Sequence, residues 1–355
     1  MTVVFAGGGT GGHLYPAIAI ADALRERAAT IAFIGAANRL EATIVPKAGY
    51  RLYTISGHPM PRRISPEIVK TVVANLWGTV QSLGVLAKLR PDIVVATGGY
   101  VCFPVALAAR IRRWLKRSAQ PVVLLEPNVA PGLTNRLLAP IVDETWHDVP
   151  IRASLRHLPP RAVAAERLGL DPSLQSILVI GGSQGARTIN DAFAALARDG
   201  AIPTGWQVLH LTGERDYTRV TAALEASRRP ADRYVVRAYL DDMADAYACA
   251  ALVVARAGAS TLGELAALGK PAILVPYPFA AEGHQAANAT RLQKAGAALV
   301  VQDAAVAAGQ LPGVLALATA RERLVEMTRR AEQLQGSDPL ATILARIETL
   351  VARRA

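Results

Sequence analysis

Short apolar runs alternate along the chain with stretches in which apolar residues recur at helical spacing. The run "TVVFA" (2–6) predicts a strand, and after a glycine-rich loop a helix is expected up to about residue 27. The run "TIAFIG" (30–35) predicts the next strand. Strands and helices that alternate in this way are typical of parallel α/β sheets.

The chain shows this arrangement twice. The first half contains three strand–loop–helix units, at 3–24, 92–111 and 121–139. After Pro150, Pro159 and Pro160 the pattern restarts, and three comparable units follow in the same order at 176–196, 251–268 and 271–289. The likeness is one of architecture, and it predicts two Rossmann-like domains. Ligands of open α/β sheets bind beyond the carboxyl ends of the strands, so two such domains facing each other would line a cleft with these loops.

A length of 355 residues exceeds what one hydrophobic core usually supports. We expect an N-terminal domain over 1–150, a C-terminal domain over 151–335 and a final helix within 336–355. The final helix is expected to pack on one of the domains, because its apolar residues are spaced along one helical face. These are Leu340, Ile343, Leu344, Ile347, Leu350 and Val351. We expect no membrane-spanning helix and no secretory signal.

Cysteine content and charge add two expectations. Cys102 and Cys249 lie far apart without metal-ligand spacing, which favours reduced, packed thiols in a cytosolic protein. The net charge is +11, and residues 1–151 carry 16 Lys and Arg against 9 Asp and Glu. This excess suits ordinary solubility or a phosphate-rich partner, either nucleic acid or an anionic membrane surface. The chain has no recognisable nucleic-acid module, so we expect no nucleic-acid partner.

Five glycines lie within the six residues 7–12. Gly7, Gly9 and Gly12 fit the pattern G-x-G-x-x-G of dinucleotide sites. Such a site also needs an acidic residue at the end of the second strand, but the nearest acid is Glu41. A dinucleotide is therefore disfavoured. The loop predicts an anion site, because its bare backbone and the following helix N-terminus offer unpaired N–H groups.

His13 lies at the start of the helix that follows this loop. A helix N-terminus disfavours the imidazolium form, and a neutral imidazole at a ligand site is a candidate general base. The alternative is a structural or merely exposed histidine.

The second half contains another loop of the phosphate-binding type, "GGSQGA" (181–186). Ser183 in this loop could cap the next helix or bond a phosphate oxygen. Further on, Thr261 and Glu264 fit a capping box, but the Glu264 carboxylate could instead accept hydrogen bonds from two ribose hydroxyls. The motif alone leaves both open. The sequence contains no D-x-D triplet, Cys/His cluster or HExxH motif, so we expect phosphate charge to be met without a metal.

Two basic segments carry tryptophan. The segment 109–120 surrounds Trp114 with five cations, and the segment 62–80 combines cations with an amphipathic helical pattern that includes Trp77. Such segments suit a membrane interface. Solvated helix ends over an ordinary core are the alternative. The candidate membrane residues are Arg62, Arg63, Lys70, Leu76, Trp77, Arg112, Arg113, Trp114 and Lys116.

Several motifs together resemble the MurG family of glycosyltransferases. They include "GGGTGGHLYPAIAIADAL", "TGGYVCFPVALAA", "EPNVAPGLTN", "GGSQGARTIN" and "HQAANA", and the likeness runs from about Val3 through Val300. The resemblance implies the GT-B fold, with the last helix returning to the N-terminal domain. It implies inverting transfer of N-acetylglucosamine from UDP-N-acetylglucosamine to the muramyl C4 hydroxyl of lipid I, which gives lipid II for peptidoglycan. It also implies no required cofactor and a peripheral place on the cytoplasmic face of the cell membrane.

The resemblance also implies roles for individual residues. His13 would be the catalytic base. The donor would be bound by Arg152, Ser183, Gln184, Tyr239, Leu240, Met243, Gly258, Ala259, Ser260, Thr261, Glu264, His284, Gln285 and Asn288. Of these, Glu264 would take the ribose hydroxyls. The acceptor would be bound by Thr10, Gly11, Gly12, His13, Gly99, Tyr100, Glu126 and Asn128. The alternatives are a GT-B enzyme with another sugar or a soluble acceptor, an NAD(P) oxidoreductase and a non-catalytic basic adaptor.

Overall fold

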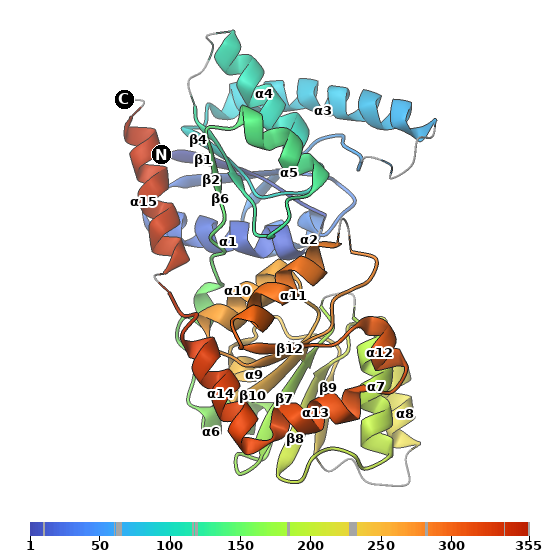
Figure 1. The fold of residues 1–355 in the computed structure, drawn as a ribbon. Helices are drawn as coiled ribbons and strands as arrows, with labels where there is room; N and C mark the ends of the chain where they lie inside the picture. Colours follow the sequence, from blue (N-terminus) through green and yellow to red (C-terminus); the bar gives the residue numbers. More distant parts are fainter. Residues whose placement is uncertain are drawn as a thin grey trace. The chain divides into compact units, whose positions relative to one another are not determined.

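The computed structural model describes residues 1–9, 11–59, 61, 66–115, 117, 120–182, 185–226, 233–280, 283–336 and 338–353. The chain divides into two compact units. Unit 1 comprises Met1–Arg152 and Ser337–Ala355, and unit 2 comprises Ala153–Gly336. Each unit is built on a six-stranded sheet in which every pairing is parallel (Figure 1).

The sheet of unit 1 has the order β3-β2-β1-β4-β5-β6. Its strands are β1 (Thr2–Ala6), β2 (Thr30–Gly35), β3 (Arg51–Thr54), β4 (Ile93–Ala96), β5 (Val122–Leu125) and β6 (Glu144–Trp146). Its helices are α1 (Gly11–Glu26), α2 (Glu41–Lys47), α3 (Glu67–Leu89), α4 (Cys102–Trp114), α5 (Leu133–Leu138), the 3-10 turn η1 (Ala139–Ile141) and α15 (Pro339–Ala352). In the sheet register, Val3 of β1 lies opposite Ile31 of β2 and Ile93 of β4.

The sheet of unit 2 has the order β12-β11-β10-β7-β8-β9. Its strands are β7 (Gln175–Ile180), β8 (Trp206–Leu211), β9 (Tyr234–Arg237), β10 (Ala250–Ala255), β11 (Ala272–Leu274) and β12 (Ala298–Val300). Its helices are η2 (Ala153–Leu155), α6 (Arg161–Leu168), α7 (Arg187–Arg198), α8 (Tyr217–Glu225), α9 (Ala244–Cys249), α10 (Ala259–Ala267), α11 (His284–Lys294), α12 (Asp303–Ala307), α13 (Leu311–Thr319) and α14 (Arg321–Glu332).

The two sheets share one topology. Numbered from the first strand of each unit, both have the order 3-2-1-4-5-6 of the Rossmann fold, which confirms the predicted fold class. The order reverses between β1 and β4 in unit 1 and between β7 and β10 in unit 2. Ligands of such sheets bind beyond the carboxyl ends of the strands at this switch point. The candidate glycine loops follow these four strands.

Successive residues of the strands in unit 1 pack into two different cores, because side chains alternate between the faces of a sheet. Val3 and Phe5 of β1 belong to the core that α1 and α15 cover, and Val4 and Ala6 to the core that α4 covers. Three buried residues of α15 complete the first core: Leu340, Ile343 and Ile347. Figure 1 shows α15, the last helix of the chain, beside α1, near its beginning.

A buried polar network lies in unit 2. The His210 ring has its Nδ1 2.7 Å from the Tyr234 hydroxyl and its Nε2 2.9 Å from Asn190 Oδ1. Asn190 Nδ2 donates to the Thr212 carbonyl at 2.9 Å and to Asp216 Oδ2 at 2.8 Å. Gly185, with a φ of +76°, leaves no room for a Cβ beside the same carbonyl. The network therefore supports the glycine loop that precedes α7.

His210 makes the stability of the protein depend on pH. Burial lowers its pKa from 6.5 to about 3, so the ring is neutral in the folded chain and takes up a proton in the unfolded chain below about pH 6.5. Its contribution is fully present above that pH and is lost as the pH falls toward the folded pKa. Between pH 7.5 and pH 5 this group should lower the free energy of unfolding by about 2 kcal/mol.

Urea unfolding at both pH values, on the native chain and on His210→Gln, would measure this contribution. The variant lacks the titrating group, so its free energy of unfolding should fall less over the same interval. Equal losses in the two proteins would show that His210 is not held neutral.

Candidate active site

The glycine loop of unit 1 connects the end of β1 at Ala6 to the start of α1 at Gly11. A Cβ on Gly7 would clash with the Thr97 hydroxyl, and a Cβ on Gly8 with the Glu41 carboxylate. Gly9 has a φ of +87°, which L-residues rarely adopt. Packing and backbone conformation therefore account for three of the five glycines. The anion-site interpretation applies to Gly11 and Gly12 in the first turn of α1, and of these a Cβ on Gly11 would also lie 2.9 Å from the Tyr15 ring.

The Glu41 side chain packs against this loop and bonds its backbone. Its side chain is fully buried, and its carboxylate accepts hydrogen bonds from the Gly9 N–H (2.9 Å) and the Ala36 N–H (3.0 Å). A Cβ on Gly35 would lie 2.7 Å from Glu41 Cγ. The carboxylate thus joins the loops after β1 and β2 and is turned into the protein. A ribose cannot reach it, which agrees with the rejection of a dinucleotide site. The sequence pattern around Glu41 gave no signal of this role, because the N–H donors come from loops that only the fold brings together.

His13 lies in the first turn of α1, against the loop that follows β4. Gly98 (φ +106°) has no room for a Cβ beside the His13 ring. Gly99 (φ +88°) has no room for one beside the Gly8 carbonyl. The two glycine loops therefore pack backbone to backbone with the imidazole between α1 and Gly98.

Cys102 holds the same two loops together. Its thiol donates to the Ala6 carbonyl at 2.9 Å and lies 3.0 Å from the Gly98 carbonyl, while the Gly98 N–H donates to the sulfur at 3.1 Å. Burial raises the pKa of this thiol to about 12, so it stays protonated and unreactive. Cys102 and Cys249 are both free and buried, which confirms the expectation of packed thiols.

The loop after β5 contains Glu126 and Asn128. The buried Glu126 carboxylate accepts hydrogen bonds from the Asn128 N–H (2.9 Å), from Asn128 Nδ2 (3.0 Å) and from Asn135 Nδ2 (2.6 Å). The His147 ring lies 3.2 Å from the Glu126 carbonyl. This geometry favours a role for Glu126 in shaping the loop and presenting Asn128, rather than the direct acceptor contact that the resemblance implied.

Two further predicted residues lie near the start of α1. The Arg152 guanidinium is 5.1 Å from the ring centroid of Tyr15, two residues beyond His13. The Tyr100 ring lies 3.9 Å from the position of a Cβ on Gly9. Unit 1 therefore brings the described acceptor candidates of the first and fourth strand ends together. Thr10 lies outside the described residues.

In unit 2, α10 begins directly after the loop that follows β10. Its N-cap is Gly258 in an extended conformation, with no side-chain cap hydrogen bond. Thr261 is the third residue of the helix and Glu264 lies in its second turn, which rules out the capping-box alternative. Glu264 is buried, and its Oε2 accepts a hydrogen bond of 2.7 Å from the Tyr247 hydroxyl. The ribose role stays a prediction.

The loop before α10 is tied to α11 and to α12. Asn288 Nδ2 of α11 donates to the Ala257 carbonyl at 3.4 Å, and the Arg256 guanidinium pairs with Asp303 at 2.5 Å. Gln285 Oε1 accepts the Tyr277 N–H at 2.9 Å, which leaves the Gln285 NH₂ group as a donor. His284 is the first residue of α11. These contacts fix the helix N-terminus that the resemblance assigns to the donor.

The remaining donor candidates lie at other strand ends. Tyr239 and Leu240 follow β9, with Tyr239 36% exposed and Met243 buried before α9. Ser183 and Gln184 lie outside the described residues, and the N-cap of α7 is Ala186. Within the described ranges, no three His, Cys, Asp or Glu residues are grouped closely enough to hold a metal ion.

A stripe of apolar side chains is exposed on α3, at the i, i+3, i+4 spacing of one helical face. The six residues of this α3 stripe, 39% to 66% exposed, are Val69, Val72, Val73, Leu76, Trp77 and Val80. Trp114 is 82% exposed at the end of α4. The candidate cation Arg113 instead pairs with Asp143 at 2.5 Å. Arg62, Arg63 and Lys116 lie outside the described residues, and no described helix is long and apolar enough to cross a membrane.

Comparison with known proteins matches both units to one family. The model of the glycosyltransferase family 28 N-terminal domain matches residues 3–146, and that of its C-terminal domain matches residues 176–341. The UDP-N-acetylglucosamine--N-acetylmuramyl-(pentapeptide) pyrophosphoryl-undecaprenol N-acetylglucosamine transferase of Halothermothrix orenii is 40% identical over 327 residues, covering 85% of this chain and 86% of the relative. The chain belongs to the MurG family of glycosyltransferase family 28.

Two further matches support the MurG family and the GT-B fold. The transferase of the same name from Frankia casuarinae is 39% identical and covers 99% of this chain and 96% of the relative. The crystal structure of Acinetobacter baumannii MurG superposes with a TM-score of 0.75 at 25% identity, covering 98% of this chain and 99% of that one.

Proposed function

We propose that this MurG family member transfers N-acetylglucosamine from UDP-N-acetylglucosamine to the C4 hydroxyl of the muramyl sugar of lipid I, giving lipid II with an inverted, β-1,4 linkage. The observation that carries the proposal is that relatives 34% to 40% identical over at least 85% of the chain are named for this transfer. The glycine loops at both switch points supply sites for two diphosphates, one in the donor and one in the lipid.

In unit 1, we assign His13 as the general base. The α1 N-terminus disfavours imidazolium, so a neutral ring is available to take the proton of the C4 hydroxyl. The C4 oxygen then attacks the anomeric carbon, and the bond to UDP breaks. The amides of Gly11 and Gly12 face the lipid diphosphate in this proposal. One helix end contributes only about 0.3–1 kcal/mol, so further donors are needed, and Asn128 and Tyr100 are candidates.

In unit 2, the N-terminal amides of α10 would meet the UDP phosphates in place of a metal ion. Glu264 would accept hydrogen bonds from the ribose hydroxyls, while the Tyr247 hydroxyl holds its second oxygen in place. The free NH₂ group of Gln285 would donate to the transferred sugar. The other donor contacts in the proposal come from Arg152, Ser183, Gln184, Tyr239, Leu240, Met243, His284 and Asn288.

Replacing His13 by Ala tests the reaction and its base. Labelled UDP-N-acetylglucosamine offered with a lipid I analogue should yield the disaccharide with the native chain. Turnover should fall by about 10²–10⁴-fold in His13→Ala, the usual contribution of a positioned base, while UDP affinity stays the same. The exposed His157→Ala serves as the matched control and should behave as the native chain. A loss below tenfold would contradict the base assignment.

Replacing Glu264 by Ala tests the donor site. Loss of a carboxylate that accepts two ribose hydrogen bonds should weaken UDP binding by about 10–100-fold in calorimetry, equivalent to about 1–3 kcal/mol. The exposed Glu322→Ala on α14 should leave UDP affinity unchanged. If Glu264→Ala bound UDP normally but melted at a lower temperature, the residue would only support Tyr247.

We further propose that unit 1 docks peripherally on the cytoplasmic face of the membrane through the α3 stripe and Trp114. Lys70 and the other cations of the two basic segments would face anionic lipid. An exposed apolar stripe flanked by cations is the pattern of interfacial helices. The described patch is less basic than the sequence suggested, because Arg113 is paired with Asp143. The apolar side chains of the α3 stripe and Trp114 therefore make most of the proposed membrane contact.

The paired substitution Leu76→Asp and Val80→Asp tests the docking. It should abolish co-sedimentation with anionic vesicles at low salt, because two carboxylates would enter the headgroup region. Leu317→Asp, at a residue 54% exposed on α13, is the matched control and should sediment normally. Undiminished co-sedimentation of the double variant would contradict the proposal.

A further inference from the structure

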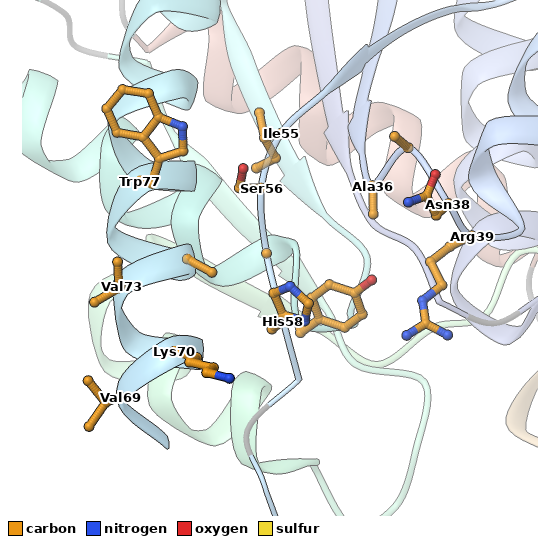
Figure 2. A pocket seen from close by; sticks show the side chains of 14 residues that line it. Ala36, Asn38, Arg39, Ile55, Ser56, His58, Val69, Lys70, Val73 and Trp77 are labelled. Carbon is orange, nitrogen blue, oxygen red and sulfur yellow. The ribbon is translucent and has the colours of Figure 1, made fainter. Parts of the chain in front are cut away.

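A pocket of about 900 Å³ opens in unit 1 beyond the ends of β2 and β3 (Figure 2). It borders the candidate acceptor loops and shares residues with the α3 stripe, but the cavity itself has no role in the function proposed above. The lining residues are Ala36–Arg39 after β2, Ile55–His58 after β3, five residues of α3 and Tyr100.

The walls of this pocket are fixed by hydrogen bonds between α3 and the loop after β3. The Ser56 N–H donates to Gln81 Oε1 at 2.6 Å. Asn75 bonds both backbone groups of His58, each at 3.1 Å. Gly78 has no room for a Cβ beside the Ser56 carbonyl, so α3 and the loop are in direct contact. The side of the pocket formed by α3 and the loop after β3 is therefore held in place.

Among the described residues that line the pocket, Arg39 and Lys70 are cationic and none is acidic. Arg39, His58 and Lys70 are all exposed to it. Figure 2 shows Lys70 extending from α3 toward His58, with Arg39 on the opposite side. Neither Arg39 nor Lys70 forms an ion pair with any of the described residues. Two unpaired cations facing one cavity favour an anionic ligand.

The two ends of the pocket differ in character. At its inner end, Tyr100 lies between Gly9 of the glycine loop and Gly57 of the pocket, close to both. At its outer rim, Val69, Val73 and Trp77 belong at the same time to the exposed α3 stripe. The pocket therefore extends from the glycine loop that precedes α1, beside His13, to the exposed α3 stripe.

We propose that this pocket binds the junction between the diphosphate and the prenyl chain of the acceptor. The prenyl-linked phosphate meets Arg39 and Lys70, and the first isoprene units pass Ile55 and Ala74 and leave over Val69, Val73 and Trp77. A phosphate joined directly to a hydrocarbon chain would pair with the two cations and would place its apolar part against the α3 stripe. The identity of the acceptor rests on the proposed function.

The first experiment measures binding of farnesyl diphosphate to the full chain by calorimetry, without vesicles or detergent. Farnesyl diphosphate should bind at least tenfold more tightly than inorganic diphosphate or farnesol alone. The pair Arg39→Glu and Lys70→Glu should weaken it at least tenfold, whereas the matched charge reversal Lys88→Glu, on α3 but outside the pocket, should not. Equal binding by the charge-reversed and control proteins would overturn the proposal.

The second experiment narrows the pocket with Ala74→Trp and compares two acceptors that share the same muramyl-peptide diphosphate head. The KM of a farnesyl-linked acceptor should rise at least tenfold, and that of a methyl-linked acceptor should change less than twofold. Equal increases for both would overturn the proposal. So would an increase that disappears when the peptide stem is removed, because the pocket would then bind the peptide.

Failure of the pocket proposal and failure of the proposed function can be distinguished. Absence of transfer from UDP-N-acetylglucosamine to either acceptor by the native chain would contradict the proposed function. Farnesyl diphosphate binding needs no sugar donor, so its loss in the charge-reversed pair would still support the pocket. Should Ala74→Trp fail to fold, the binding experiment decides alone.

Discussion

The buried carboxylate of Glu41 fixes the conformation of the glycine loop before α1 in unit 1. It accepts the N–H groups of Gly9 and Ala36, and it fills the space that side chains would occupy at Gly8 and Gly35. An ionised carboxylate without such partners would be expensive to bury, so loop conformation and carboxylate stabilise each other. The ring of His13 and the amides at the start of α1 take their positions from this arrangement.

In unit 2 the corresponding loops are held by different contacts. The loop before α10 is held by the Asn288 amide and by the ion pair of Arg256 with Asp303. After β7, Gly185 packs against the Thr212 carbonyl that Asn190 holds. Both units thus place a helix N-terminus beyond the carboxyl ends of parallel strands, where an anion binds. One topology used twice gives this MurG family member two candidate anion sites, which the proposed function assigns to the diphosphates of a nucleotide sugar and of a lipid.

The alternation of strands and helices was predictable from sequence, because parallel strands buried on both faces leave continuous apolar runs. The sites were less predictable. The pattern at Thr261 suggested a helix start, but the helix begins earlier, where β10 ends. The burial of Glu41 and Glu126 could not be predicted from sequence, because charged residues are mostly exposed and only the fold brings N–H donors to these two carboxylates. Periodicity identified an amphipathic α3, but which stripe stays exposed depends on packing against α4.

The free energy of unfolding and the acceptor KM of Glu41→Gln test the role of this carboxylate most directly. Glutamine has nearly the same shape but presents an N–H₂ group to one of the two backbone N–H donors. We expect Glu41→Gln to lose about 1–3 kcal/mol of unfolding free energy and to show an increased acceptor KM, with UDP affinity unchanged. A variant with native stability and native acceptor KM would contradict this role of Glu41.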